Sequence, residues 1–263
     1  MQFSELMASV SGAGSEWRVA VTPDWQQGRT LFGGLQAALA VQAMRGLIGN
    51  AAPLRTLQTT FIAPIPAGDI RIATRVLRSG RSATQVEAQL FDGEQLACAV
   101  LGIFGLSRES VLAIAPPWPG LTVEPPEARE LRYVEGVTPA FTQYLNFRWA
   151  SGGFPFRGAA EPKTQIYVRL REDRPVGELQ LIALADSIPS PGLSVLNTRA
   201  QASSMTWMLE LLRPDYDPAG DAWWLMDAEV NAAQSGYLSQ AATLWSPDRK
   251  AVALSRQSVV AFA

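Results

Sequence analysis

The chain of 263 residues contains no histidine and only one cysteine, Cys98. Without histidine, Ser-His-Asp and Cys-His triads, histidine-bound zinc and a histidine general base are all excluded. A lone cysteine excludes an intrachain disulfide and zinc sites built on cysteine clusters, so we expect no metal and favour a reducing compartment. If the chain is an enzyme, its base must be a carboxylate, a lysine, a tyrosine or a less usual group.

Charge and long apolar runs are also scarce. The formal net charge is -2 and 17% of the residues are charged, so we expect neither nucleic acid nor an anionic membrane as a partner. No apolar run is long enough for a membrane span. The segment from Met1 to Trp17 lacks the basic and then apolar pattern of a signal peptide, and the expected location is therefore the cytoplasm.

The rest of the chain repeats one plan. In the first half, the pattern predicts a helix and then four strands, over residues 35–48, 54–62, 70–77, 83–90 and 96–104. In the second half, it predicts a strand, a helix and four strands, over residues 165–170, 176–185, 203–212, 223–230, 237–245 and 251–262. A helix combined with an antiparallel meander indicates an α+β fold in each half.

A proline-rich stretch lies between the two halves. Its prolines favour an extended connector: Pro116, Pro117, Pro119, Pro125 and Pro126. We predict an N-terminal domain over 1–110, a linker over 111–135 and a C-terminal domain over 136–263. Short echoes between the halves indicate duplication, such as Ala67-Gly68-Asp69 with Ala219-Gly220-Asp221 and Ser79-Gly80 with Ser235-Gly236.

Several short motifs, in this order, resemble the double-hotdog acyl-CoA thioesterase family, the thioesterase II-like proteins. The motifs are Phe32-Gly33-Gly34, Leu77-Arg78-Ser79-Gly80-Arg81-Ser82, Leu184-Ala185-Asp186, Arg213-Pro214 and Ser255-Arg256-Gln257. The resemblance covers nearly the whole chain. It implies two fused hotdog domains of α+β class, hydrolysis of acyl-CoA without a cofactor, and assembly into a homo-oligomer.

The resemblance also implies a site. In this family an aspartate at the second-half helix, a serine or threonine on the following strand and a glutamine on the last strand hold the hydrolytic water. Asp186 and Gln257 match two of these positions, and Ser204 matches the hydroxyl. Thr206 is expected on the same strand face as Ser204, and Ser203 remains an alternative.

Other residues are candidates for binding the substrate. Gly33 and Gly34 precede a predicted helix, whose first N–H groups could meet an oxyanion. Arg78 and Arg81 flank a turn and could meet CoA phosphates. Each has a simpler interpretation, because glycine pairs often form tight turns, most such arginines are merely solvated, and Asp186 could simply end a helix.

Two other functions compete with hydrolysis. A non-catalytic protein that binds acyl-CoA or another small molecule could use the same fold. A hotdog hydratase or dehydratase is disfavoured, because the familiar versions need an Asp-His pair. The chain also has Trp207-Met208-Leu209-Glu210 where family members often carry histidine, and a loop rich in Ser, Pro and Gly over 187–199, so the acyl-chain preference stays open.

Overall fold

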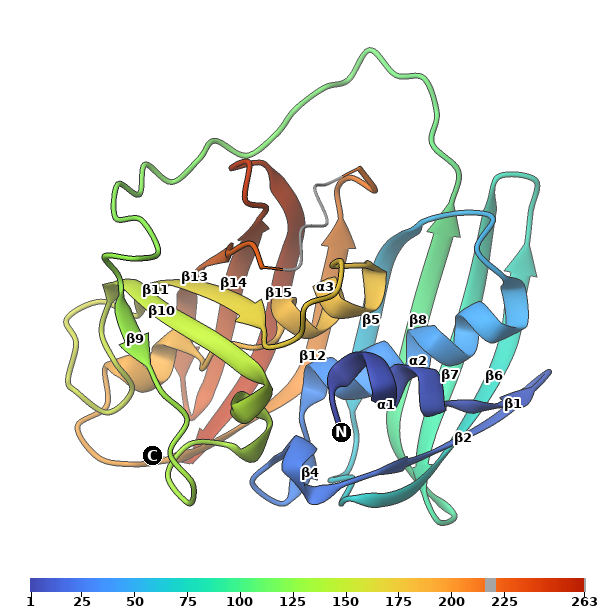
Figure 1. Ribbon diagram of the computed structural model, residues 1–263, viewed down its shortest axis with the longest axis horizontal. Coiled ribbons are helices and arrows are strands. Elements are labelled where there is room, and N and C mark those ends of the chain that lie inside the picture. Colours follow the sequence, from blue (N-terminus) through green and yellow to red (C-terminus); the bar gives the residue numbers. More distant parts are fainter. Residues whose placement is uncertain (216–220, 263) are drawn as a thin grey trace.

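The computed structural model describes residues 1–215 and 221–262, and it divides them into two halves (Figure 1). The elements of the first half are α1 (Phe3–Ser9), β1 (Ser11–Ala13), β2 (Glu16–Val21), β3 (Gln26–Gln27), β4 (Thr30–Leu31), α2 (Gly33–Ile48), β5 (Leu54–Phe61), β6 (Gly68–Ser79), β7 (Ala83–Asp92) and β8 (Gln95–Gly105). A short 3-10 turn, Pro23–Trp25, precedes β3.

The second half repeats the helix and the meander. Its elements are β9 (Arg129–Leu131), a 3-10 turn (Ala140–Tyr144), β10 (Leu145–Gly152), β11 (Lys163–Leu170), α3 (Glu178–Ala185), a second 3-10 turn (Pro191–Ser194), β12 (Gln201–Leu211), β13 (Trp224–Gln234), β14 (Tyr237–Trp245) and β15 (Ala251–Phe262). The predicted echo at Ala219-Gly220 lies outside the described residues.

One antiparallel sheet of 13 strands joins the halves, in the order β1-β2-β6-β7-β8-β5-β12-β15-β14-β13-β11-β10-β9. The junction is the pairing of β5 with β12, where Thr60 lies opposite Thr206 and Thr56 opposite Glu210. Outward from this junction the two halves repeat one order: β5, β8, β7 and β6 of the first half correspond to β12, β15, β14 and β13 of the second. The predicted α+β class with two helix-plus-sheet halves is therefore confirmed, and the duplication is visible in the strand order.

Helix α2 is buried along almost its whole length against the inner face of the sheet. Its single charged residue is Arg45, and most of its other side chains are fully buried. A helix that is apolar on every side is stable only in such a position. The alanines of α2 allow β6, β7, β8 and α3 to approach it closely.

Helices α2 and α3 pack against each other on the same side of the sheet (Figure 1). Near the C-terminus of α2, the guanidinium of Arg45 donates to both carboxylate oxygens of Glu178, at 2.9 and 2.6 Å. The N–H of Leu54 donates to the same carboxylate at 3.1 Å. Because Glu178 is the first residue of α3, this ion pair holds the two halves together at one end of the helix pair.

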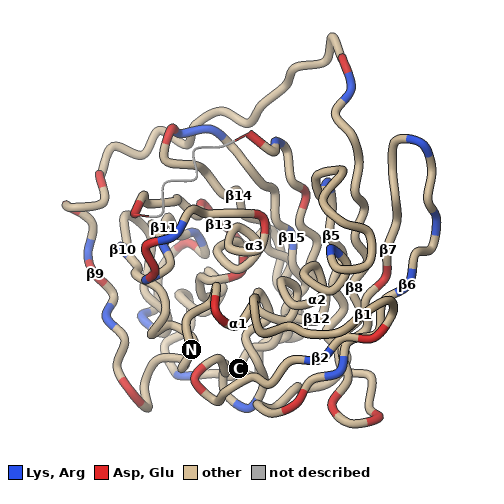
Figure 2. Tube along the Cα trace, turned by 45° about the vertical axis from the view of Figure 1, so that its right-hand side comes forward, with Lys and Arg blue, Asp and Glu red and all other residues tan. Residues whose placement is uncertain are grey.

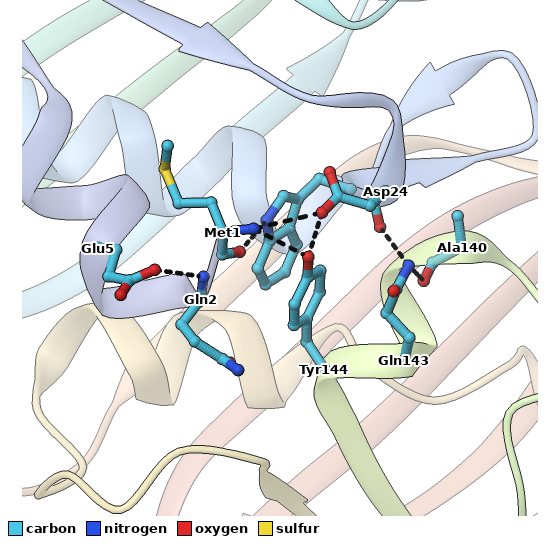
Figure 3. A network of polar contacts seen from close by, with 8 residues as sticks. Met1, Gln2, Glu5, Asp24, Ala140, Gln143 and Tyr144 are labelled. Atoms are coloured by element: carbon cyan, nitrogen blue, oxygen red, sulfur yellow. Dashed lines mark hydrogen bonds and ion pairs between the residues drawn. The ribbon is translucent and has the colours of Figure 1, made fainter.

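A second polar cluster links the halves near the N-terminus (Figure 3). The hydroxyl of Tyr144 donates to the carboxylate of Asp24, and the Met1 ammonium contacts both groups. The side chain of Gln143 donates to the backbone carbonyl of Asp24 at 3.4 Å. The ring of Trp25 stacks on Tyr144 with centroids 4.4 Å apart, so the first-half turn is fixed to the second half by both polar and aromatic contacts.

The predicted linker over 111–135 is only partly free of structure. Its first part arcs over the molecule (Figure 1), with Val111, Leu112 and Ile114 exposed. Further on, Trp118 and Leu121 pack against buried side chains of the second-half sheet. Residues 129–131 within the predicted linker form β9, which pairs with β10 and closes the edge of the sheet. The sequence pattern also missed α1, β1, β2 and β10.

The ion pair between the halves can be tested by changing Glu178→Gln. Arg45 would lose its charged partner in a partly buried position, with side-chain exposures of 13% and 23%. We expect the free energy of unfolding, measured by urea denaturation, to fall by about 1–3 kcal/mol.

The matched control is Glu130→Gln, which removes the carboxylate of the exposed pair with Arg132. An exposed pair contributes little, so this change should alter the free energy of unfolding by less than about 0.5 kcal/mol. Equal effects of the two substitutions would contradict the role given to Glu178.

Candidate active site

Asp186 is the residue that directly follows helix α3, and it lies between the two halves. Its backbone ends the helix, with the N–H bonded to the carbonyl of Leu184. Its side chain lies against the N-terminus of α2, where the N–H of Gly34 donates to the carboxylate. The interpretation of Asp186 as a residue that merely ends a helix is therefore incomplete, since its carboxylate contacts an element of the other half.

Two side chains from the sheet join Asp186. Gln257, on β15, donates through Nε2 to Oδ1 of Asp186 at 2.5 Å. Ser204, on β12, donates through Oγ to Oε1 of Gln257 at 3.2 Å. The structure thus brings together Asp186, directly after α3, with Gln257 on β15 and Ser204 on β12, although Asp186 and Gln257 are separated by 71 positions along the chain.

Glycine is required at the start of α2 because the chain approaches Asp186 so closely there. A Cβ atom at Gly33 would lie 2.7 Å from Oδ2 of Asp186 and 3.0 Å from the Phe61 ring. A Cβ atom at Gly34 would lie 3.1 Å from Cβ of Asp186 and 2.6 Å from the Phe32 ring. The glycine pair is the start of a helix and not a tight turn, and its lack of side chains lets backbone N–H groups reach the carboxylate.

The surroundings of Asp186 change its acidity. Burial removes water from the carboxylate and raises the pKa of Asp186 from 3.8 to about 7, although the hydrogen bonds from Gln257 and Gly34 act in the opposite direction. A carboxyl group with a pKa near neutrality can accept a proton from water and release it again at the same pH. This is the property that a base needs in a chain without histidine.

Thr206 does not share a strand face with Ser204, so that expectation is wrong. The register of β12 against β15 shifts between these residues: Ser204 lies opposite the buried Val259, whereas Thr206 lies opposite Ser258. The extra residue is a β-bulge, which reverses the alternation of side chains. Thr206 is exposed as a result, and the alternative Ser203 is exposed as well.

Arg78 and Arg81 lie far from Asp186. Both are exposed at the β6–β7 hairpin, which carries basic residues in Figure 2. Across the sheet, Arg78 pairs with Gln85 on β7, and Gln85 pairs with Ile103 on β8. Phe61, whose ring lies beside Gly33 and therefore near Asp186, pairs with Cys98 on the same strand β8. The five positions between 98 and 103 correspond to about 17 Å along a strand. The structure therefore does not gather the arginines with the carboxylate.

Neither the one cysteine nor the acidic side chains form an alternative site among the residues that the structure describes. Cys98 is fully buried, and burial raises the pKa of its thiol, so it is not an activated nucleophile. Within residues 1–215 and 221–262, no group of three or more Cys, Asp or Glu side chains is placed to hold a metal ion. Across the same residues, no helix is both long enough and apolar enough to cross a bilayer.

Two hollows on the surface lie away from Asp186. One of about 460 Å³ lies over β11 to β15 and is lined by Asp227, Glu229 and Arg256 among others, and one of about 640 Å³ lies beside β2 and β6. Neither contains Asp186, Gln257 or Ser204 in its lining. The hydrogen-bonded carboxylate, and not the size of a cavity, identifies the candidate site, because it combines burial with directed polar contacts.

Sequence comparison identifies the family. The profile of the acyl-CoA thioesterase N-terminal domain matches residues 21–105, and that of the acyl-CoA thioesterase C-terminal domain matches residues 120–261. The chain belongs to the acyl-CoA thioesterase family. The resemblance inferred from the motifs is thus confirmed. No curated protein sequence matches the chain significantly.

Solved structures confirm the double-hotdog fold of this thioesterase-family chain. A hotdog protein of unknown function from Alicyclobacillus acidocaldarius superposes with a TM-score of 0.88 at 20% identity, covering 99% of this chain and 98% of that one. An acyl-CoA thioesterase II, TesB2, from Mycobacterium marinum gives a TM-score of 0.77 at 14% identity, with coverages of 98% and 97%. A tesB protein from Mycobacterium avium subsp. paratuberculosis gives 0.77 at 12%, with coverages of 100% and 100%.

Sequence reasoning missed Gln240, which also belongs to the cluster. Its Nε2 donates to Oε1 of Gln257 at 3.0 Å from the neighbouring strand β14. Gln240 lies directly opposite Gln257 in the hairpin formed by β14 and β15. A partial signal was present, because Gln240 lies five residues before the end of its strand and Gln257 six residues after the start of the next strand. Only the register, which shifts between Leu244 and Trp245, places the two glutamines opposite each other.

The raised pKa makes a prediction about stability in the variant Asp186→Asn. In the unfolded chain Asp186 ionises near 3.8 and in the folded protein near 7. At a pH between these two pKa values, Asp186 is protonated in the folded protein and ionised in the unfolded chain, so unfolding releases a proton. The wild-type protein therefore loses stability as the pH rises through this range. Asparagine does not ionise, and we expect the variant to be more stable than wild type at pH 8 by about 1–3 kcal/mol, less than the full shift because the side chain is partly solvated.

Urea denaturation at pH 8 and at pH 4 measures this difference. Near pH 4 the carboxyl group is protonated in the folded protein, so the gain should nearly vanish. A variant that is less stable than wild type at pH 8 would show that Asp186 is not held in a desolvated position.

Proposed function

We propose that this protein hydrolyses acyl-CoA thioesters with a water molecule that is activated by Asp186 and oriented by Gln257 and Ser204. Membership of the acyl-CoA thioesterase family supports the reaction class. The observation that carries the assignment of residues is the half-buried carboxylate of Asp186, joined by side chains from two distant strands. Such convergence is typical of an active site.

Asp186 is the base in this proposal. Its ionised carboxylate takes a proton from water while the water oxygen forms a bond to the thioester carbonyl carbon. The tetrahedral intermediate then collapses, the bond from carbon to sulfur breaks, and the proton held by Asp186 passes to the sulfur. The products are a carboxylic acid and free CoA thiol, and Asp186 is ionised again. A pKa of about 7 suits both transfers.

The start of α2 supplies the positive end of a helix dipole beside this reaction. The N–H of Gly34 already donates a hydrogen bond to Asp186, so it is not free to donate to the oxyanion. Gly33 stands one residue earlier in the same turn, and its N–H is the candidate donor to the oxyanion. In this proposal Gly33 therefore stays the candidate for binding the substrate oxyanion, whereas Gly34 holds the base.

The remaining expectations stay proposals. Arg78 and Arg81 could bind only the phosphate end of CoA, which is separated from the thioester by the long pantetheine arm. Thr206 is left out of the proposed site, because it is exposed on the opposite face of β12 from Ser204. A cytoplasmic location and a homo-oligomer are proposed from the single free cysteine and from the family resemblance.

The proposal is tested with a panel of acyl-CoA thioesters of different chain lengths and a thiol reagent that detects free CoA. We expect turnover by the wild-type protein and a fall in kcat of about 10³-fold in Asp186→Asn, since general base catalysis is lost. The rate at low pH should rise with pH, with a midpoint near 7 set by Asp186.

The control variant is Asp227→Asn. Asp227 is a half-buried aspartate on β13 whose pKa burial also raises, but it lines the hollow away from the site. It should keep wild-type turnover. Full activity in Asp186→Asn would disprove the assigned base, and binding of acyl-CoA without turnover across the panel would instead identify a non-catalytic binding protein.

A further inference from the structure

The amide of Gln257 can point in either of two directions, and only one of them serves Asp186. When Nε2 faces Asp186 it donates to the carboxylate, as in the structure at 2.5 Å. If the amide turned around, Oε1 would face the carboxylate, and two acceptors would repel each other unless Asp186 were protonated. The orientation of this amide is therefore coupled to the ionisation of Asp186.

Two donors from opposite sides hold the oxygen of Gln257. Ser204 approaches from β12 at 3.2 Å, and Gln240 approaches from β14 at 3.0 Å. Both strands are direct neighbours of β15 in the sheet. A serine hydroxyl can donate or accept, so Ser204 alone does not define which end of the amide it meets.

We propose that Gln240 is a positioning residue that holds the amide of Gln257 with its nitrogen toward Asp186. This inference rests on the proposed function of the site, but Gln240 itself touches neither the carboxylate nor the reacting atoms. Its contact reaches Asp186 only through Gln257, so the two glutamines and the carboxylate form one chain of hydrogen bonds with a single direction of donation.

The burial of Gln240 supports this role. Its Oε1 is shielded from water and has no hydrogen-bond partner among the described residues. An unpaired buried acceptor costs free energy. Turning the amide of Gln240 alone would bring its oxygen against the oxygen of Gln257. If both amides turned together, the two N–H groups of Gln240 would take the buried position where its oxygen now has no partner, and Oε1 of Gln257 would face the carboxylate of Asp186.

The test measures the titration of Asp186 directly, without turnover. Protein labelled with 13C at the aspartate carboxyl is titrated by NMR, and the Asp186 signal is identified by its loss in Asp186→Asn. In Gln240→Met, which keeps the size of the side chain but removes the donor, we expect the midpoint of Asp186 to rise by about half to one pH unit. The acid limb of the kcat profile should move by the same amount.

A double-mutant cycle separates positioning from a general structural effect. Because Gln240 acts through Gln257, Gln240→Met should cause no further shift in a Gln257→Leu protein. The control is Gln89→Met on β7, a half-buried glutamine in the other half, which should leave the Asp186 midpoint unchanged. If Gln240→Met does not fold, Gln240→Leu replaces it in the same cycle.

An unchanged midpoint in the single Gln240 variant, or an equal shift in the presence and absence of Gln257, overturns the proposal. These results do not depend on catalysis. If the midpoint shifts as expected but no thioester is hydrolysed by the wild-type protein, the proposed function fails while the positioning role of Gln240 stands.

Discussion

The packing of the end of α3 against the start of α2 is the contact on which this structure depends. Asp186 directly follows α3 and accepts a hydrogen bond from the N–H of Gly34. At the opposite end of the helix pair, Glu178 forms an ion pair with Arg45. Both contacts cross between the halves, so the two hotdogs cannot separate without exposing a carboxylate and a guanidinium. The candidate site and the cohesion of the two halves thus have a common physical basis.

The same contact sets the chemistry of Asp186. Burial between the halves raises the pKa of Asp186 toward neutrality, while hydrogen bonds from Gln257 and Gly34 limit the rise. A carboxylate with fewer donors would stay protonated at neutral pH, and one with more water around it would be a weaker base. The proposed base therefore depends on a balance between desolvation and hydrogen bonding that costs the folded protein stability.

The sheet completes the site through its register. Gln257 lies between Trp207 on β12 and Gln240 on β14, so its side chain has a large apolar neighbour on one side and a polar one on the other. The β-bulge in β12 turns Ser204 inward and Thr206 outward. A shift of one residue in either strand would exchange these faces, since side chains alternate along a strand.

The sequence by itself determined the class of fold and the duplication, and it predicted the carboxylate, amide and hydroxyl side chains that the structure brings together. The alanine-rich helix, the two meanders and the lack of histidine are local patterns, and local patterns are visible in a chain without its coordinates. Only the tertiary structure decided that Gly34 serves Asp186, that Thr206 faces away, that Arg78 lies far off and that Gln240 joins the cluster. These depend on strand register and on contacts between the halves, which arise from packing over long sequence separations.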